Sequence, residues 1–511
     1  MRQILTLNSL IRTGKKLVEI IRTVKSPHDV LSQQITRIES LWYKTSVQLK
    51  VIQTVSKKHL MDDEHARVQD DVLQRLASCL TLAVQKAESV LEEGSDKVKR
   101  LKFGLRKESI DKTIRELEEW QRYYDPTWYL VVLINNTLVD SELLQLAPPR
   151  SNAATSLSGT TALRSIRQEG TEGFPQAQHE VHVSLDPSVF DTGQTTAIRF
   201  SDTKLFTQVS ESETRTFLVD SLSCGHFPSV AMARSDSEAL ARRLKVADRE
   251  ASSLPKCQGI VKMKNAAGDL ESIHILFRFR GGPPRSLRQD LLETKSVSLS
   301  HILGIARCLA KSISFVHVCD FVHKNIRPEA VITTDTGVGA SSQEAFLLGF
   351  VSFRNVNFHT LRQGDNMIER NLYRHPSRQG GLIRDNYVMQ HDIYSLGVCL
   401  LEIGLWMSFV SYSSEGMPNL SKALGLEDVY DLDSWSADMG KAIKERLVAL
   451  ARECLPCRMG DKYTAVVLTC LTCLDVDSGF SADLEMKDKD GILVGVRFIE
   501  RVLLRLEEIS M

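Results

Sequence analysis

The sequence predicts an α+β protein with a helical N-terminal part, residues 1–146, a linker, residues 147–200, and a mixed C-terminal part, residues 201–511. Three observations predict this order. Apolar residues recur at helical spacing before residue 147. The linker is rich in Ser, Thr, Gly, Ala and Pro and has no periodicity. The mixed part begins with short β-branched and aromatic runs, to about residue 282, and continues as helices from about residue 283.

The N-terminal part contains successive amphipathic helices. One is predicted to begin at Ser26 and Pro27, because Ser is a favoured N-cap and Pro fits the first helical position. The next has a stripe of apolar residues on one face: Val68, Val72, Leu76, Leu80, Ala83, Ala87 and Val90. Amphipathic helices with short connections pack as an antiparallel bundle, so we expect a helical bundle over residues 1–146.

Charge is uneven along the chain, although the formal net charge of the whole is zero. Residues 1–60 contain eleven Lys or Arg and three Asp or Glu, a local net charge of +8. This pattern is compatible with an anionic membrane surface, with an acidic protein partner, or with a solvated helix face. The neutral total gives no reason to expect a nucleic-acid partner.

Composition indicates a cytoplasmic protein, with peripheral membrane attachment left open. Hydrophobic residues make up 42% and charged residues 25% of the chain, which is usual for globular proteins. No uninterrupted apolar run approaches the roughly 20 residues of a spanning helix, and no signal-peptide cleavage pattern follows the N-terminus. Ten cysteines in 511 residues do not form a disulfide framework, so reduced thiols are expected.

Four strands and one helix are predicted between residues 201 and 282. The strand segments are "FTQVS", "RTFLVDSL", "QGIVKMK" and "SIHILFRFR", and the helical segment is "DSEALARRLKVADREASSL". The segment "FRGGPP", residues 279–284, interrupts the pattern as a hinge between two lobes would.

Two segments of the helical region resemble the functional loops of protein kinases. In "FVHKNIRPEAVI", residues 321–332, His323 matches the His of H-R-D-L-x-x-x-N, while Asn325 stands for its Asp and Ala330 for its Asn. In "LLGFVSFR", residues 347–354, Phe350 matches the Phe of D-F-G and Gly349 stands at its Asp.

Two further kinase-like segments follow in the expected order. "YRHPS" keeps Pro376 of the Y-x-A-P-E segment, and "DIYSLG" keeps Asp392 and Gly397 of a D-x-W/Y-S-x-G helix start. The resemblance implies a bilobal kinase-like domain, with a small β-rich lobe at about 201–282 and a large helical lobe at about 283–511. It also implies that His323 and Phe350 pack in the core and that Asp392 anchors the backbone of the 321–332 loop.

The groups that perform phosphoryl transfer are missing. Asn325 cannot accept a proton near neutral pH, and neither Ala330 nor Gly349 has a ligand atom for Mg²⁺. No G-x-G-x-x-G or V-A-x-K is found, and the nearest string, "SVAMAR", places Ala233 where the Lys would stand. We therefore expect a pseudokinase that is not an enzyme and has no cofactor. An atypical ATP-dependent kinase remains an alternative.

The complete arrangement is similar to fungal proteins with HeLo-type bundles and kinase-like domains, and to the mixed-lineage kinase-like executioners of necroptosis. Residues 101–133 and 454–471 carry the fungal resemblance together with the two loops. It implies a kinase-like domain that regulates an effector bundle in fungal cell death or incompatibility, with protein partners and a homo-oligomer as options. The first 25 residues depart from this family because they contain six Lys or Arg, which favours surface binding over insertion. An adaptor without effector activity is the other open function.

Four cysteines have the spacing of a zinc site, with two C-x2-C pairs formed by Cys454, Cys457, Cys470 and Cys473. Against zinc, Cys470 and Cys473 lie in the apolar helical stretch "YTAVVLTCLTCL", where a buried Cys behaves as a small hydrophobic residue. We expect no metal site.

Overall fold

A computed structural model describes most of the chain. The described residues are 2–23, 29–61, 63–92, scattered positions between 112 and 146, 163–164, and 181–509 with gaps. The longer gaps are 210–213, 248–251, 336–342, 356–364, 427–436 and 481–491. The predicted helix start at Ser26 and Pro27 lies outside the described residues, as does most of the segment 101–133.

The chain divides into two compact units, residues 1–177 and residues 178–511. The first is helical and the second contains all of the described β-strands, so the protein is of mixed α+β class as the sequence predicts.

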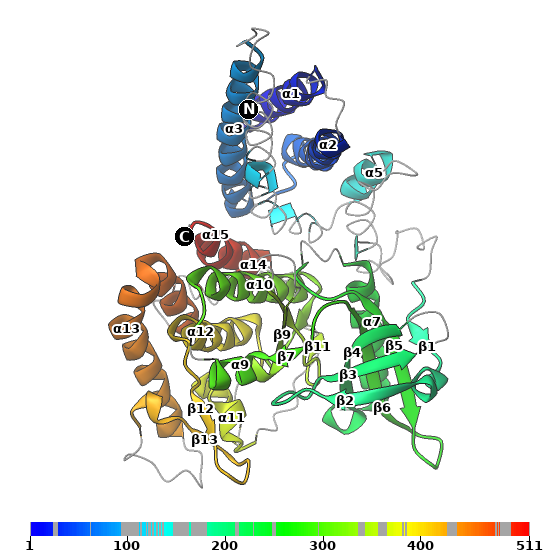
Figure 1. Cartoon of the computed structure of the whole chain (residues 1–511), viewed down its shortest axis with the longest axis vertical. Coiled ribbons are helices and arrows are strands. Elements are labelled where there is room, and N and C mark those ends of the chain that lie inside the picture. The colour runs from blue at the N-terminus through cyan, green and yellow to red at the C-terminus, as the bar shows by residue number, and fades with distance from the viewer. Residues whose placement is uncertain are drawn as a thin grey trace. The chain divides into compact units, whose positions relative to one another are not determined.

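The first unit contains the helices α1 (Arg2–Thr23), α2 (Asp29–Lys57), α3 (Asp63–Glu92) and α5 (Thr137–Leu146) (Figure 1). The predicted stripe on α3 is buried from Val68 to Ala83. Helix α1 packs against both α2 and α3, and its Leu10 and Leu17 are buried. A Cβ atom on Gly14 would lie 2.0 Å from the Trp42 ring, so glycine permits the close approach of α1 and α2.

The expected linker contains ordered elements of both units. Within the first unit, Arg164 is fully buried; its Nε donates to Asp140 Oδ1 at 2.6 Å and its Nη1 to the carbonyl of Val131 at 2.8 Å. Within the second, the strands Ser184–Leu185 and Gly193–Ala197 lie before residue 200, so the predicted boundary at that residue is too late. Sequence reasoning missed the strand Gly193–Ala197 because all five of its residues are exposed, which leaves no apolar alternation.

A six-stranded sheet opens the second unit, in the order β1-β5-β6-β4-β3-β2. Its strands are β1 (Ser184–Leu185), β2 (Gly193–Ala197), β3 (Lys204–Val209), β4 (Thr214–Ser223), β5 (Cys257–Lys264) and β6 (Leu270–Phe279). The four predicted strands correspond to β3, β4, β5 and β6. Pairing is antiparallel except for β1, which pairs in parallel with β5. Helix α7 (Val230–Val246) contacts β5 and β6.

The remainder of the second unit is mainly helical. Its longer helices are α9 (Leu287–Glu293), α10 (Leu299–Val318), α12 (Met389–Leu405), α13 (Ala437–Leu471) and α14 (Ile492–Phe498) (Figure 1). Short strands separate them: β7 (Arg285–Ser286), β8 (Phe321–Val322), β9 (Val331–Asp335), β10 (Gln343–Leu347), β11 (Arg354–Asn355), β12 (Val410–Tyr412) and β13 (Pro418–Leu420). The short helices include α11 (Ile368–Asn371), α15 (Leu504–Glu507), a π-helical turn at Ile499–Leu503, and 3-10 turns at Pro328–Ala330, Pro376–Arg378 and Lys422–Leu424.

Helix α10 is the one described helix that is long and apolar enough to cross a membrane by length and composition. Its most apolar window has a mean hydropathy of 1.3, and 67% of that window is buried inside the protein. It packs against α12 and β10, so it serves as a core helix in this unit.

Candidate functional site

The two kinase-like loops meet in the second unit. Residues 323–330 connect β8 to β9, and residues 348–353 follow β10. The amide Nδ2 of Asn325 donates to the carbonyl oxygen of Gly349 at 3.0 Å, and the N–H of Leu348 donates to the carbonyl of Ala330 at 2.7 Å. The three positions expected to lack catalytic groups, Asn325, Ala330 and Gly349, are therefore neighbours in space.

The space beside Gly349 is filled. A Cβ atom built on Gly349 would lie 2.9 Å from the Ala330 Cβ and 2.9 Å from Asn325 Nδ2. The backbone φ of Gly349 is +76°, in the left-handed region that disfavours other residues. A carboxylate side chain at this position would need both loops to move, because Ala330 and Asn325 already occupy the space.

Asn325 is engaged at both ends of its amide group. Its Oδ1 accepts a hydrogen bond from Arg327 Nε at 3.0 Å, while its Nδ2 is bound to Gly349. The guanidinium of Arg327 also pairs with Asp202 at 2.9 Å. Asn325 therefore acts here as a structural bridge between the two loops.

Asp392, at the start of α12, binds the backbone of the 323–330 loop. Its carboxylate accepts hydrogen bonds from the N–H groups of His323 at 2.7 Å and Lys324 at 3.0 Å, which is the contact that the kinase resemblance implies. His317 Nε2 lies 3.0 Å from Oδ2, and the Tyr387 hydroxyl donates to Oδ1 at 2.7 Å. Burial would raise the pKa of Asp392, but these partners outweigh burial and hold the pKa below its usual value.

His323 is a buried core residue. Its ring lies 4.7 Å from the ring of Phe350, and its Nδ1 accepts the N–H of Asn325 at 3.3 Å. Burial lowers the pKa of His323 to about 4, so the imidazole is neutral near pH 7. Phe350 also stacks on Phe277 of β6, with the ring centroids 6.0 Å apart. This contact joins the loop cluster, residues 323–330 and 348–353, to the sheet.

Two other predicted residues support the packing around the site. A Cβ atom on Gly397 would lie 2.8 Å from the Cys470 Cβ, so glycine lets α12 and α13 approach closely. Pro376 begins a short 3-10 helix, Pro376–Arg378. Just before it, the carbonyl of Tyr373 accepts a hydrogen bond from the Ser395 hydroxyl of α12 at 2.7 Å.

Asp220, a fully buried residue of β4, is a site residue that the sequence motifs do not predict. Its Oδ2 accepts the N–H groups of Gly349 at 2.8 Å and Phe350 at 3.0 Å. Its Oδ1 accepts the Thr203 hydroxyl at 2.5 Å. Burial raises the pKa of Asp220 to about 6, although its hydrogen bonds oppose that shift. An Asp inside the apolar run "FLVDSL" was the available signal.

The segment "SVAMAR" does not correspond to the strand that carries the lysine in kinases. These residues form the first turns of α7, whose N-cap is Ser229, so Ala233 lies on a helix and not on a strand. The Ser229 hydroxyl accepts the N–H of Met232 at 3.1 Å, and such a cap starts a helix. Glu238 of α7 instead pairs with Lys262 of β5.

The β2–β3 connection, residues 198–203, is bonded to the 323–330 loop. The Ser201 hydroxyl donates to the carbonyl of Glu329 at 2.7 Å, and Asp202 pairs with Arg327. Phe200, with a φ of +54°, places its ring 4.6 Å from Tyr412. Together with the Thr203–Asp220 hydrogen bond, these contacts hold residues 198–203 against the 323–330 loop.

The four cysteines of the zinc pattern do not assemble. Cys454 and Cys457 are exposed, whereas Cys470 and Cys473 are buried. Across the described residues, no group of three or more His, Cys, Asp or Glu side chains is placed to hold a metal ion. Burial raises the pKa of both Cys470 and Cys473, which keeps them as thiols.

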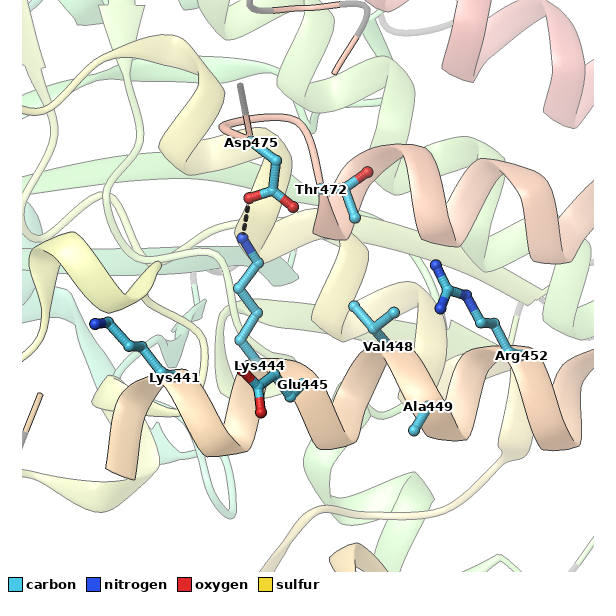
Figure 2. Close-up of a pocket in the computed structure, with 8 residues that line it drawn as sticks. All are labelled: Lys441, Lys444, Glu445, Val448, Ala449, Arg452, Thr472 and Asp475. Carbon is cyan, nitrogen blue, oxygen red and sulfur yellow. Dashed lines mark hydrogen bonds and ion pairs between the residues drawn. The ribbon is translucent and has the colours of Figure 1, made fainter. Parts of the chain in front are cut away.

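An open groove of about 510 Å³ lies along α13, away from the loop residues named above. Figure 2 shows Lys441, Lys444, Val448 and Arg452 on one side of it and Thr472 and Asp475 on the other. The ammonium of Lys444 pairs with Asp475 across the groove.

Comparison with known proteins adds no assignment, because no protein-family model matches the sequence and no curated protein matches it.

Proposed function

We propose that residues 178–511 form a kinase-like domain without phosphotransferase activity, which regulates the helical unit formed by residues 1–177. The resemblance in sequence suggests a fungal cell-death or incompatibility pathway for such a protein. The observation that carries the proposal is the filled contact between Asn325, Ala330 and Gly349.

The order of elements supports the kinase-like part. Strands β2, β3 and β4 form a meander, helix α7 follows, and β5 and β6 return as a hairpin beside β4. A mainly helical region comes next and contains the two loops. A small β-rich lobe with one helix, followed by a large helical lobe, is the arrangement that the sequence resemblance implies.

Contacts at the loops support the absence of catalysis. Phosphoryl transfer needs a carboxylate base and Mg²⁺ ligands held near the transferred phosphate. At those positions the chain has an amide occupied at both ends, a methyl group and a glycine. The β2–β3 connection, which would cover phosphates in a kinase, is instead bonded to Glu329 and Arg327.

The distribution of charge in the first unit supports surface binding by that unit. The apolar residues Leu7, Leu10 and Leu17 of α1 are buried, so they are not available for insertion into a membrane. Exposed bases remain at Arg12, Lys15, Lys50, Lys57 and Lys58. Anionic lipid headgroups attract such bases, each worth about 1 kcal/mol near the surface.

Nucleotide binding by the full chain tests the non-catalytic part. We expect no thermal stabilisation by ATP with Mg²⁺ and no transfer of radiolabelled phosphate. Saturable stabilisation together with turnover that is lost in Asn325→Ala would overturn the proposal.

Vesicle co-sedimentation tests the regulatory part. We expect residues 1–177 to bind phosphatidylserine vesicles at low salt and the full chain to bind them less. In the full chain, the double variant Lys57→Glu with Lys58→Glu should weaken the remaining binding, while the matched double variant Lys256→Glu with Lys264→Glu, at exposed sites of the second unit, should not. Absence of binding by either protein would remove the membrane role.

A further inference from the structure

Cys454 and Cys457 are the two exposed cysteines of the chain. The other eight are buried or half-buried. Both exposed residues lie in α13, three positions apart, so their side chains project from the same face of the helix. None of the contacts described above in the first unit, the sheet or the loop cluster involves either cysteine.

The helix is weakened at this turn. Pro456 lies between the two cysteines and has no N–H group, so it cannot make the helical hydrogen bond to the carbonyl of Arg452. Four residues later, Gly460 has φ 80° and ψ 169°, which is a break in the helical backbone. The turn that carries both thiols is thus less tightly held than a regular helix.

The spacing is close to that of a disulfide. Helical neighbours at i and i+3 have Cβ atoms roughly 5–6 Å apart, and a disulfide needs about 3.5–4.5 Å. An adjustment of roughly 1–2 Å closes this difference, and the backbone at Pro456 and Gly460 is where it can occur. A disulfide formed in this way is strained, so it is readily reduced again.

We propose that Cys454 and Cys457 form a reversible redox site, in which a low-molecular-weight disulfide such as oxidised glutathione converts the two thiols into an intrahelical disulfide. The thiolate of one cysteine attacks a sulfur of oxidised glutathione and expels a glutathione thiolate. The second cysteine thiolate attacks the mixed disulfide and expels the second glutathione. The two cysteine protons pass to the two glutathione thiolates, and two electrons move from the protein to the oxidant.

Charge beside the pair suits this oxidant. Arg452 and Arg458 are both exposed and flank the two cysteines, while oxidised glutathione carries several carboxylates. The carboxylate directly before the pair in the chain, Glu453, is itself paired with Arg446 at 3.5 Å. The proposal is independent of the proposed regulatory function, because it concerns only the α13 surface.

The sequence provides a direct assay. Trypsin cleaves after Arg452 and Arg458, so both cysteines lie in one peptide, residues 453–458. The folded full chain is equilibrated with reduced and oxidised glutathione at several ratios, free thiols are alkylated, and the peptide is weighed. We expect a peptide two hydrogen atoms lighter and without alkyl groups, which dithiothreitol converts to the doubly alkylated form.

Two variants make the result specific. Cys454→Ser should leave Cys457 alkylated or joined to one glutathione, with no internal disulfide. Cys79→Ser, at a half-buried cysteine of the first unit, should leave the disulfide unchanged. A peptide that stays doubly alkylated at every ratio, carries only separate glutathione adducts, or is linked only to a second chain would overturn the proposal.

Discussion

Asp220 and Asp392 perform similar tasks in the second unit, at two neighbouring loops. Each is fully buried, and each accepts two successive backbone N–H groups: those of Gly349 and Phe350 for Asp220, and those of His323 and Lys324 for Asp392. Their pKa values nevertheless shift in opposite directions. The pKa of Asp220 is raised to about 6, and that of Asp392 is lowered.

The difference lies in the remaining partners. Asp392 also contacts the His317 ring and accepts the Tyr387 hydroxyl, and these side-chain contacts lower its pKa. Asp220 has one hydroxyl, from Thr203, and the negative charge of Asp202 nearby. Two backbone N–H groups and one hydroxyl do not offset the loss of water around Asp220, whereas the additional side-chain contacts of Asp392 do.

The largest expected effect is at Asp392. Asp392→Asn places an NH2 group among donors that need a charged acceptor, so we expect the free energy of unfolding of the second unit to fall by about 3 kcal/mol at pH 7.5. Urea titration followed by hydrogen–deuterium exchange of peptides from residues 321–332 measures this. Asp220→Asn is the matched control and should cost under about 1 kcal/mol, because the amide can accept the same N–H groups and donate to Thr203. Equal losses in both variants would contradict the comparison.

The second effect is a pH dependence carried by Asp220. Its pKa is raised from 3.8 to about 6, so the folded state binds the proton more tightly than the unfolded state does. The stabilisation of the folded state by this proton is fully present below the pKa of the unfolded state, 3.8. That stabilisation is lost as the pH rises through 6, a change of about 3 kcal/mol over the whole range. Asp220→Asn lacks this titration, so its stability relative to the wild type should increase from pH 4 to pH 7. A difference between the two proteins that does not vary with pH would exclude a raised pKa.

The third prediction concerns Gly349, in the loop that Asp220 binds. It separates the cost of steric crowding at this residue from the cost of its left-handed backbone. Gly349 and Gly268 have similar φ angles, +76° and +88°, but a Cβ atom on Gly268 meets nothing within 4 Å. Gly268→Ala should therefore cost about 1 kcal/mol for its left-handed backbone. Gly349→Ala should cost about 1 kcal/mol more, since Ala330 and Asn325 must move. Thermal unfolding of the two variants, measured side by side, gives the difference. Equal costs would show that the space beside Gly349 is not filled.

The sequence could identify one of the two carboxylates and not the other. Asp392 stands in the segment "DIYSLG", and the kinase resemblance implies its contact with the loop. Asp220 belongs to no motif, and its role depends on β4 lying beside residues that follow 129 positions later in the chain. Regular amphipathic elements such as α3 and β6 follow from local periodicity. Local periodicity does not predict the exposed strand β2 or the burial of Arg164. The positions of both depend on strand pairing or ion contacts between distant residues.

The smallest effect sharpens the account of Asp220. Asp202 has a side chain that is 53% exposed, so its ion pair with Arg327 should contribute less than about 1 kcal/mol. Its negative charge also raises the pKa of Asp220. Asp202→Asn should therefore change stability little at pH 7.5 and move the pH midpoint of the Asp220 titration to a lower value. The shift should shrink in 1 M salt, because the charge of Asp202 is partly screened by solvent ions. The double variant Asp202→Asn with Asp220→Asn should have no titration in this range. A midpoint that is the same with and without Asp202 would assign the raised pKa to burial alone.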